Sequence, residues 1–239
     1  MTDTTNSPLE GNVLFYKNPE PLDPGLHGAL GVNPADKPYA FVGQTNVVPL
    51  TVTEFAAAAL SYPVIFTGDN RQPVVVMGLR QGENLFVAAD GEFRPDAYIP
   101  AYVRRYPFVF ADDKQNQRLI LCIDRGAEIV AEGGQNPLFV NGQASDYTTM
   151  AMEFCNNFEQ ERQRTEAFVK LITDLDLLDV REAVFTPRNP DGTPGAPQKL
   201  AELRDNGALG QIYAHLVSLL GWDRLIALAF LRQAPGTVN

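Results

Sequence analysis

The stretch that decides the fold reads YIPAYVRRYPFVF and covers residues 98–110. Pro100 suits the first turn of a short helix, and Pro107 ends that helix before a run of apolar strand formers. Arg104 and Arg105 therefore lie between two blocks of aromatic and branched apolar side chains. Because a guanidinium group is costly to bury without a partner or water, the fold has to supply a receiver for both cations.

Short apolar runs separated by polar turn residues surround this stretch and predict strands. Such short turns join antiparallel neighbours, because a parallel return needs a longer crossover. The predicted strands of this meander are Val64–Thr67, Val74–Leu79, Leu85–Ala88, Phe108–Phe110 and Arg118–Ile123. Upstream we expect strands at Val13–Tyr16, Tyr39–Val42 and Asn46–Leu50, a Pro-rich connector at Pro19–Pro24, and a helix over Phe55–Leu60 capped by Thr51 or Thr53.

The longest predicted helix runs from Tyr147 to Leu178 and is capped by Ser145 or Asp146. After a loop at 191–197, two or three further helices are expected over 200–231. The fold class is therefore α+β, with a mostly antiparallel meander sheet, a long helix and a helical C-terminal third. We expect a flexible tail over 1–10 and a single domain over 11–239, sheet-rich over 11–145 and helix-rich over 146–239.

The formal net charge of −10 argues against nucleic acids and anionic membrane surfaces as partners, because both attract clustered Lys and Arg. The N-terminal residues lack the pattern of a secretory signal, and no run of about 18 apolar residues predicts a membrane span. Cys122 and Cys155 lie far apart among apolar neighbours, which indicates reduced core thiols. We therefore expect a soluble, cytoplasmic protein; export without a signal would leave no trace in the sequence.

The sequence lacks the common motifs of catalytic and nucleotide-binding sites. No Walker-type phosphate loop, GxGxxG turn or GxSxG elbow occurs. The Asp112–Asp113 pair and the group Asp174, Asp176 and Asp179 are candidate metal carboxylates, but the pair lies in a predicted hairpin loop and the group lacks the glycine of a calcium loop. We expect no metal and no cofactor.

The arginine pair is open to two interpretations. The first is an internal ion pair with an acid close in the chain, and the acids concerned are Asp90, Asp96, Asp124 and Glu128. The second is a clamp that holds a carboxylate or phosphate through a guanidinium group, with Tyr102 or His27 as the proton-transfer group. Successive helical residues point about 100° apart, so one ligand would not engage both arginines equally.

The middle of the long helix is almost wholly polar and carries Glu159, Arg162, Arg164 and Glu166. Opposite charges at this spacing are typical of a solvated helix with ion pairs along its own surface. The alternative is that this face leaves the core and contacts another protein or a second copy of the chain.

Three segments resemble one bacterial family. The runs LFVAADGEFRPDAYIPAYVRRYPFVF and RLILCID are similar to the core of the SapC-like family, and GALGQIYAHLVSLLGWDRLIAL resembles its terminal motif. The resemblance spans roughly Tyr16 to Leu228 and departs from the family pattern before Lys199, where a final strand is usual. It implies an association with surface layers by name only, and no catalytic residues that could be carried over.

Three functional hypotheses follow. The first is a non-catalytic accessory or binding protein that acts through contacts with a partner protein or with itself. The second is an enzyme or sensor that binds a small anion through Arg104 and Arg105. The third, from the resemblance alone, is a surface-layer component.

Overall fold

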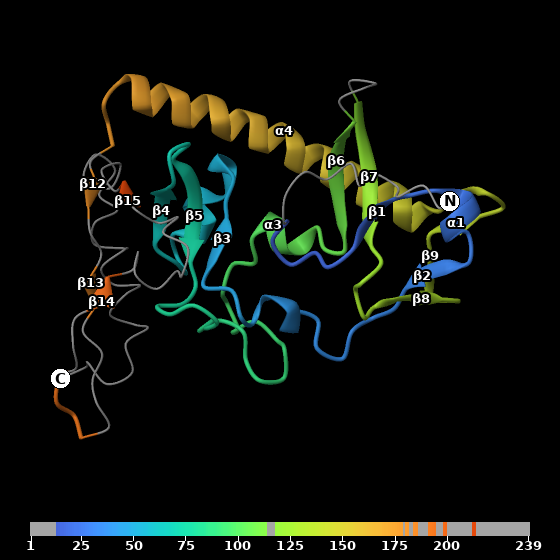
Figure 1. The fold of residues 1–239 in the computed structure, drawn as a ribbon, viewed down its shortest axis with the longest axis horizontal. Coiled ribbons are helices and arrows are strands. Elements are labelled where there is room, and N and C mark those ends of the chain that lie inside the picture. Colours follow the sequence, from blue (N-terminus) through green and yellow to red (C-terminus); the bar gives the residue numbers. More distant parts are fainter. Residues whose placement is uncertain are drawn as a thin grey trace, which may run out of the picture. The chain divides into compact units, whose positions relative to one another are not determined.

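The computed structural model describes residues 13–113, 118–178 and 191–194, and the backbone of four short strands at 180–181, 184–185, 198–199 and 212–213. Contacts between Cα atoms divide the chain into two units, each built from two separate segments. Unit 1 combines Met1–Pro38 with Arg104–Glu159, and unit 2 combines Tyr39–Val103 with Gln160–Asn239. Figure 1 shows an α+β fold of short antiparallel strands and one long helix, α4.

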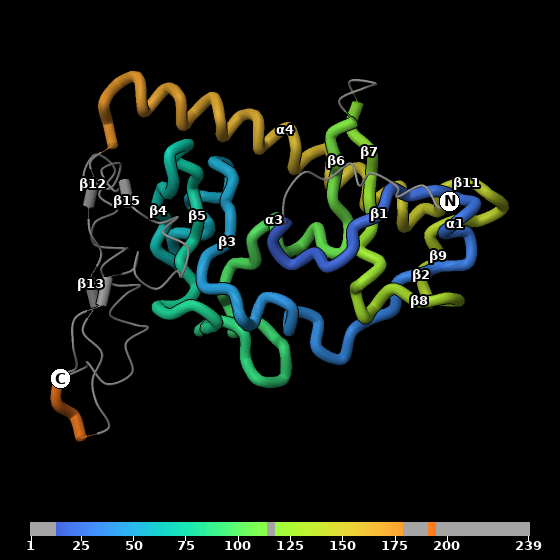
Figure 2. Tube along the Cα trace, in the orientation of Figure 1, coloured from blue at the N-terminus to red at the C-terminus, as the bar shows by residue number. Residues whose placement is uncertain are grey.

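Unit 1 contains two three-stranded antiparallel sheets and a small hairpin. The first sheet has the order β1 (Pro19–Pro21), β7 (Arg118–Asp124), β6 (Phe108–Asp113), and the second has the order β8 (Val130–Glu132), β2 (Leu30–Val32), β9 (Asn136–Pro137). The hairpin pairs β10 (Phe139–Val140) with β11 (Gln143–Ala144), and a short helix α1 spans Pro24–His27. In Figure 2 the blue N-terminal segment lies along strands more than 90 residues later in the sequence, as the β1–β7 and β2–β8 pairings require.

The core of unit 1 is formed by apolar residues from both chain segments. Its fully buried members include Ile123 on β7 and Leu138 between β9 and β10, and Cys155 adds a side chain from α4. A strand with one buried face alternates buried and exposed residues. Strand β7 does not, because its last four residues are all buried. Both faces of the C-terminal half of β7 therefore lie inside unit 1.

Unit 2 is centred on three antiparallel strands, β3 (Val47–Pro49), β4 (Val64–Thr67) and β5 (Gln72–Val76). The strand order of the whole sheet is β12–β15–β4–β5–β3, and a separate pair joins β13 to β14. The remaining elements are η1 (Ala40–Val42), η2 (Val52–Glu54), α2 (Phe55–Ala58), α3 (Ala101–Arg104), β12 (Val180–Arg181), β13 (Val184–Phe185), β14 (Gln198–Lys199) and β15 (Ile212–Tyr213).

Helix α4 covers Asp146–Asp174 and begins in unit 1 and ends in unit 2. The hydroxyl of Ser145 accepts a hydrogen bond from the N–H of Thr148 (3.1 Å) and so caps its first turn, as predicted. In unit 2 the hydroxyl of Thr165 accepts from the N–H of Val52 (2.8 Å), and the ring of Phe168 lies 5.9 Å from that of Phe55. The long helix and the antiparallel pairing confirm the α+β part of the predicted fold class. The prediction of one meander sheet is wrong, because the β4–β5 and β6–β7 hairpins belong to different sheets. The predicted helical C-terminal third lies outside the residues that the structure describes.

Several predicted strands are confirmed, and the helix near residue 55 is shorter than expected. The hairpins β4–β5 and β6–β7 lie where the turn residues placed them, and β3 falls within Asn46–Leu50. The Thr51 cap is confirmed: its N–H and hydroxyl both donate to the Glu54 carboxylate, at 3.0 and 2.7 Å. The predicted helix is split into η2 and the four residues of α2.

The third strand of the predicted meander, Leu85–Ala88, is wrong. That segment makes a single bridge, between Val87 and Phe93. The side chain of Asn84 fixes it as a loop instead, since its amide donates to the carbonyls of Val42 and Thr45 and its oxygen accepts from the N–H of Phe86. A buried side chain here satisfies backbone groups that a strand ladder would otherwise use.

Three predictions in the N-terminal region are also wrong. Val13–Tyr16 forms a turn rather than a strand, closed by a bond from the N–H of Tyr16 to the carbonyl of Val13. Tyr39–Val42 contains the 3₁₀ helix η1, in which the N–H of Val42 bonds to the carbonyl of Tyr39 rather than to another strand. The predicted connector Pro19–Pro24 contains β1, which tolerates its prolines because it pairs on one side only.

The predicted loop at 191–197 is confirmed over its first part, where the N–H of Thr193 donates to Asp191 (2.9 Å). A two-residue strand at Gln198–Lys199 pairs with Val184–Phe185. The predicted tail over 1–10 and the helices over 200–231 fall on residues outside those described, except for the strand Ile212–Tyr213.

Candidate functional site

The arginine segment begins in unit 2 with helix α3, whose start is held by a buried carboxylate. Glu54 accepts hydrogen bonds from the backbone N–H of Ala101 (2.7 Å) and from the hydroxyl of Tyr98 (3.0 Å). This carboxylate serves two helix starts, because it also accepts the bonds from Thr51. The sequence predicts α3 correctly, but not its support from a residue 47 positions earlier.

In unit 1 the two guanidinium groups lie over aromatic rings. The Cζ atom of Arg104 is 5.3 Å from the ring centroid of Phe154, and that of Arg105 is 4.7 Å from the ring centroid of Phe158. Arg105 also lies 5.8 Å from the ring of Tyr16. Attraction between a cation and an aromatic face is worth about 0.5–2 kcal/mol, depending on how far the pair is removed from water. These contacts with Phe154 and Phe158 of α4 join residues about 50 positions apart, so no local sequence pattern predicts them.

Asp124, one of the acids proposed as an arginine partner, is fully buried and holds other groups. It accepts from the backbone N–H groups of Lys17 (3.0 Å), Asn18 (2.7 Å) and Gly126 (3.0 Å). The hydroxyl of Tyr106 also donates to it at 3.3 Å. Burial and this neighbouring carboxylate both raise the pKa of Tyr106, so its phenol remains protonated.

Arg104 and Arg105 line a pocket of about 210 Å³ in unit 1, which we call the arginine pocket. It forms where the end of α3 and the start of β6 face the first turns of α4. Its lining residues are Arg104, Arg105, Tyr106, Phe108, Tyr147, Met150, Ala151 and Phe154.

The lining of the arginine pocket combines two cations with apolar walls and has no acidic side chain. Phe108 is buried, whereas Met150 is 61% exposed, so the pocket runs from the core to the surface. Burial raises the pKa of Tyr147, which leaves its phenol protonated. The pocket is therefore suited to a ligand that has both an apolar part and a negative charge.

Cys155 lies next to Arg105 but is not a nucleophile. Its side chain is buried, and burial raises its pKa to about 11 despite the opposing effect of the Arg105 charge. A thiol reacts as the thiolate, so Cys155 stays unreactive at neutral pH. Burial likewise raises the pKa of Cys122 to about 12. Both cysteines are free and buried, which agrees with the predicted core thiols.

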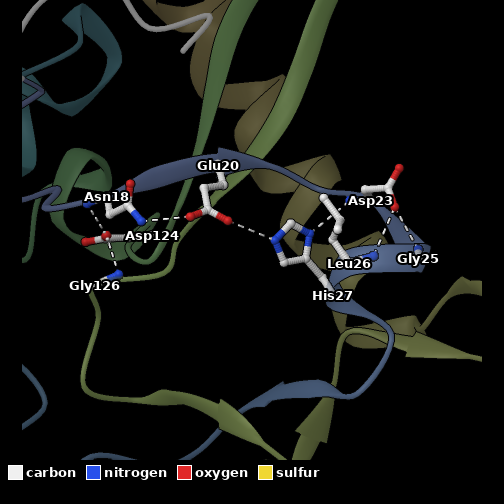
Figure 3. A network of polar contacts seen from close by, with 8 residues as sticks. All are labelled: Asn18, Glu20, Asp23, Gly25, Leu26, His27, Asp124 and Gly126. Carbon is white, nitrogen blue, oxygen red and sulfur yellow. Dashed lines mark hydrogen bonds and ion pairs between the residues drawn. The ribbon is translucent and has the colours of Figure 1, made fainter. Parts of the chain in front are cut away.

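Figure 3 shows His27, the second candidate group for proton transfer, inside a network of structural contacts. Its Nδ1 accepts from the backbone N–H of Asp23 (3.1 Å), and its Nε2 lies 3.3 Å from a carboxylate oxygen of Glu20. Asp23 in turn caps α1 by accepting from the N–H groups of Gly25 and Leu26. With 2% of its surface exposed, His27 fixes α1 against β1.

The structure therefore separates the predicted site residues. Arg104 and Arg105 meet in one pocket, whereas His27 and Tyr102, which is also buried, are not among the residues that line it. A signal for the pocket was present in the sequence: Tyr147, Met150, Ala151 and Phe154 are spaced as one face of a helix. What the sequence does not give is the contact of that face with residues about 45 positions earlier.

The charged face of α4 has ion pairs along the helix itself. In unit 2, Arg162 pairs with Glu166, and Arg164 pairs with Glu161 at 2.9 Å. These side chains are largely exposed, except that of Glu161. The arrangement fits the solvated-helix interpretation, in which each pair adds a few tenths of a kcal/mol. Glu159, the remaining predicted member, lies at the end of unit 1 and is half-buried.

No cluster of three or more metal-ligating side chains occurs among the residues that the structure describes. Of the candidate metal carboxylates, Asp113 pairs with Arg118 and Asp174 pairs with Lys170. Within the same described ranges, no helix has the length and apolarity needed to cross a membrane.

Comparison with known proteins finds one family: the family model described as SapC matches residues 22–194. No curated protein and no solved structure matches the chain. The match covers both arginines, the whole of α4 and the whole arginine pocket.

Proposed function

The chain belongs to the SapC family, and on that premise we propose that it is a non-catalytic binding protein that contacts a partner protein through the arginine pocket. The observation that carries this proposal is the composition of the pocket, in which guanidinium groups and aromatic rings surround an apolar hollow. Arginine, tyrosine and other aromatic side chains, with methionine, are enriched where proteins bind one another.

The size of the pocket favours a protein partner over a drug-sized molecule. Small-molecule sites usually measure about 300–1,000 Å³. The arginine pocket, at about 210 Å³, is smaller than this range and fits a single anchoring side chain. A partner protein would add contacts outside the pocket, whereas a small ligand would have to gain its affinity within it.

Affinity capture tests this proposal. The tagged full-length chain is isolated at native expression level, and co-purifying proteins are identified and quantified by mass spectrometry. Arg104 is exposed, so Arg104→Glu reverses a charge at the pocket without removing core packing. Arg125→Glu is the matched control, because Arg125 is also an exposed arginine of unit 1 and does not line the pocket.

We expect a near-stoichiometric partner with the wild-type chain and with Arg125→Glu, reduced at least tenfold with Arg104→Glu. A partner retained by all three proteins would contradict the proposal, as would the lack of any stoichiometric partner. A double substitution, Arg162→Glu with Arg164→Glu, examines the charged face of α4 in the same experiment. If only the double variant loses the partner, the contact surface is the charged face of α4 and not the arginine pocket.

A small anionic ligand is the second candidate, favoured by the two cations in the pocket lining. A guanidinium group binds a carboxylate or phosphate through two parallel hydrogen bonds. Native mass spectrometry of the purified chain would then show a bound anion that Arg104→Glu loses and Arg125→Glu retains. A chain that purifies without a bound anion would argue against this candidate.

A further inference from the structure

We propose that the arginine pocket recognises an acidic peptide segment in which one leucine, methionine or phenylalanine is flanked by aspartate or glutamate. This inference rests on the proposed function and names the chemistry of the partner. It follows from three properties of the pocket: its local charge, the position of its cations and its capacity.

The local charge of the pocket is opposite to that of the chain. The chain has 19 Lys and Arg against 29 Asp and Glu, a net charge of −10, whereas the pocket lining contains two arginines and no acid. A positive site on an acidic protein attracts carboxylates locally while the rest of the surface repels other acidic proteins. The pocket therefore selects a segment whose acidic residues lie beside the anchor, rather than any acidic surface.

The cations are held in place by two aromatic rings of α4, one of which lines the pocket. Arg104 lies over the ring of Phe154 and Arg105 over the ring of Phe158. Stacking restricts a side chain that otherwise has many rotamers, so less entropy is lost when a carboxylate binds. Arg104 is exposed and lies at the surface end of the pocket, where the residue next to an inserted side chain would lie.

The capacity of the pocket sets the size of the anchor. A volume of about 210 Å³ is below the range of about 300–1,000 Å³ that is usual for small-molecule sites. This accommodates one medium-sized apolar side chain on the Phe108 floor. Met150 at the rim is exposed and unbranched, so it adapts to anchors of different shape. The pocket therefore holds one anchor at a time, and leucine, methionine and phenylalanine are all suited to it.

The test uses a phage-displayed library of random twelve-residue peptides, selected on the immobilised full-length chain. Peptides are counter-selected on Ala151→Trp, in which a large side chain fills the pocket while both arginines remain. We expect the selected peptides to contain an apolar residue flanked by at least two acids. One such peptide, labelled with fluorescein, is then used to measure affinity by fluorescence anisotropy.

The labelled peptide should bind at least tenfold more weakly to Arg104→Glu and to Ala151→Trp, and within twofold of wild type to Arg125→Glu. Its affinity should also fall as sodium chloride is raised, because exposed charges are screened. Met150→Glu provides a second rim variant at an exposed position, so the test does not depend on whether Ala151→Trp folds. It should weaken binding through repulsion of the flanking acids.

Three results would overturn the inference: no enriched peptides, enriched peptides without acidic residues, or peptides that bind equally well to Arg104→Glu and Met150→Glu. Dimerisation of the chain through the pocket, seen by analytical ultracentrifugation and lost in Arg104→Glu, would also overturn it. A partner captured through Arg104 whose pocket-binding segment is not acidic would refute the inference but leave the proposed function standing. A chain with no partner that depends on Arg104 would refute both.

Discussion

Arg104 and Arg105 illustrate how one protein accommodates two adjacent cations in an apolar segment. Each guanidinium group lies over a different ring of α4, Phe154 for Arg104 and Phe158 for Arg105. Because guanidinium is planar and weakly hydrated, it packs on an aromatic face at lower cost than an ammonium group. Lysine at position 104 or 105 would not reproduce this contact.

The two thiols give a prediction for single residues that also carries a pH dependence. With pKa values raised to about 11 for Cys155 and about 12 for Cys122, both stay protonated in the folded chain at pH 8. We expect neither to react with a disulfide reagent such as DTNB in the native protein, and both to react in urea. Rapid labelling of Cys155 without urea would show that the core of unit 1 opens readily.

The same shifts fix the sign of the pH effect on stability. An unfolded thiol has a pKa near 9.0. The unfolded chain therefore loses its thiol protons from pH 9 upward, whereas the folded chain keeps that of Cys155 until about pH 11. Burial of the two protonated thiols therefore contributes fully to the stability of the fold below pH 9. This contribution is lost as the pH rises from about 9 to about 11. Replacement of both cysteines by alanine should make this part of the alkaline destabilisation disappear.

At the scale of elements, the buried carboxylate of Glu54 holds the first residues of two short helices. A helix of four residues such as α3 has too few internal hydrogen bonds to be stable alone. Glu54 supplies acceptors for Thr51 and Ala101 at the two helix starts, and for Tyr98 between them. This arrangement fixes the chain just before it reaches Arg104.

Glu54→Ala should lower the free energy of unfolding by about 3 kcal/mol, because it leaves several buried donors without an acceptor. The measurement is urea denaturation followed by circular dichroism. Glu92→Ala in the same unit is the control, since Glu92 is exposed and should change stability by less than about 0.5 kcal/mol. Equal losses in the two variants would refute the role assigned to Glu54.

At the scale of the whole molecule, the two units are discontinuous in sequence. The chain passes between them three times, and two of these crossings lie inside helices, at Val103–Arg104 in α3 and at Glu159–Gln160 in α4. A continuous helix couples the folding of its two halves, because each residue fixed favours the next. On this basis we propose that the two units fold together as the single domain predicted over 11–239.

We therefore expect one cooperative unfolding transition for the full-length chain. Calorimetry measures it: the calorimetric and van't Hoff enthalpies should agree, and urea curves from circular dichroism and thiol labelling should coincide. Two separated transitions, with thiol exposure in only one of them, would show that unit 1 unfolds independently, because both cysteines belong to that unit.

The sequence by itself determined the features whose interactions are local. The cap at Ser145 and the apolar spacing of the following residues predict α4, and turn residues predict the β4–β5 and β6–β7 hairpins. These elements depend on hydrogen bonds between residues near one another in the chain, so their signals survive in a short window of sequence. Residues 98–110 are a further example, because Pro100 and Pro107 predict the short helix α3 and the strand β6 that follows it.

Only the tertiary structure decided which distant residues share a site. Leu85–Ala88 has the composition of a strand, but the Asn84 side chain holds it as a loop by bonding to residues about 40 positions earlier. The arginine pocket likewise requires Arg104 to meet Phe154, and His27 is removed from it by its contacts with Glu20 and Asp23. Many pairings of apolar and charged segments satisfy the same local pattern, and close packing of the whole chain selects one of them.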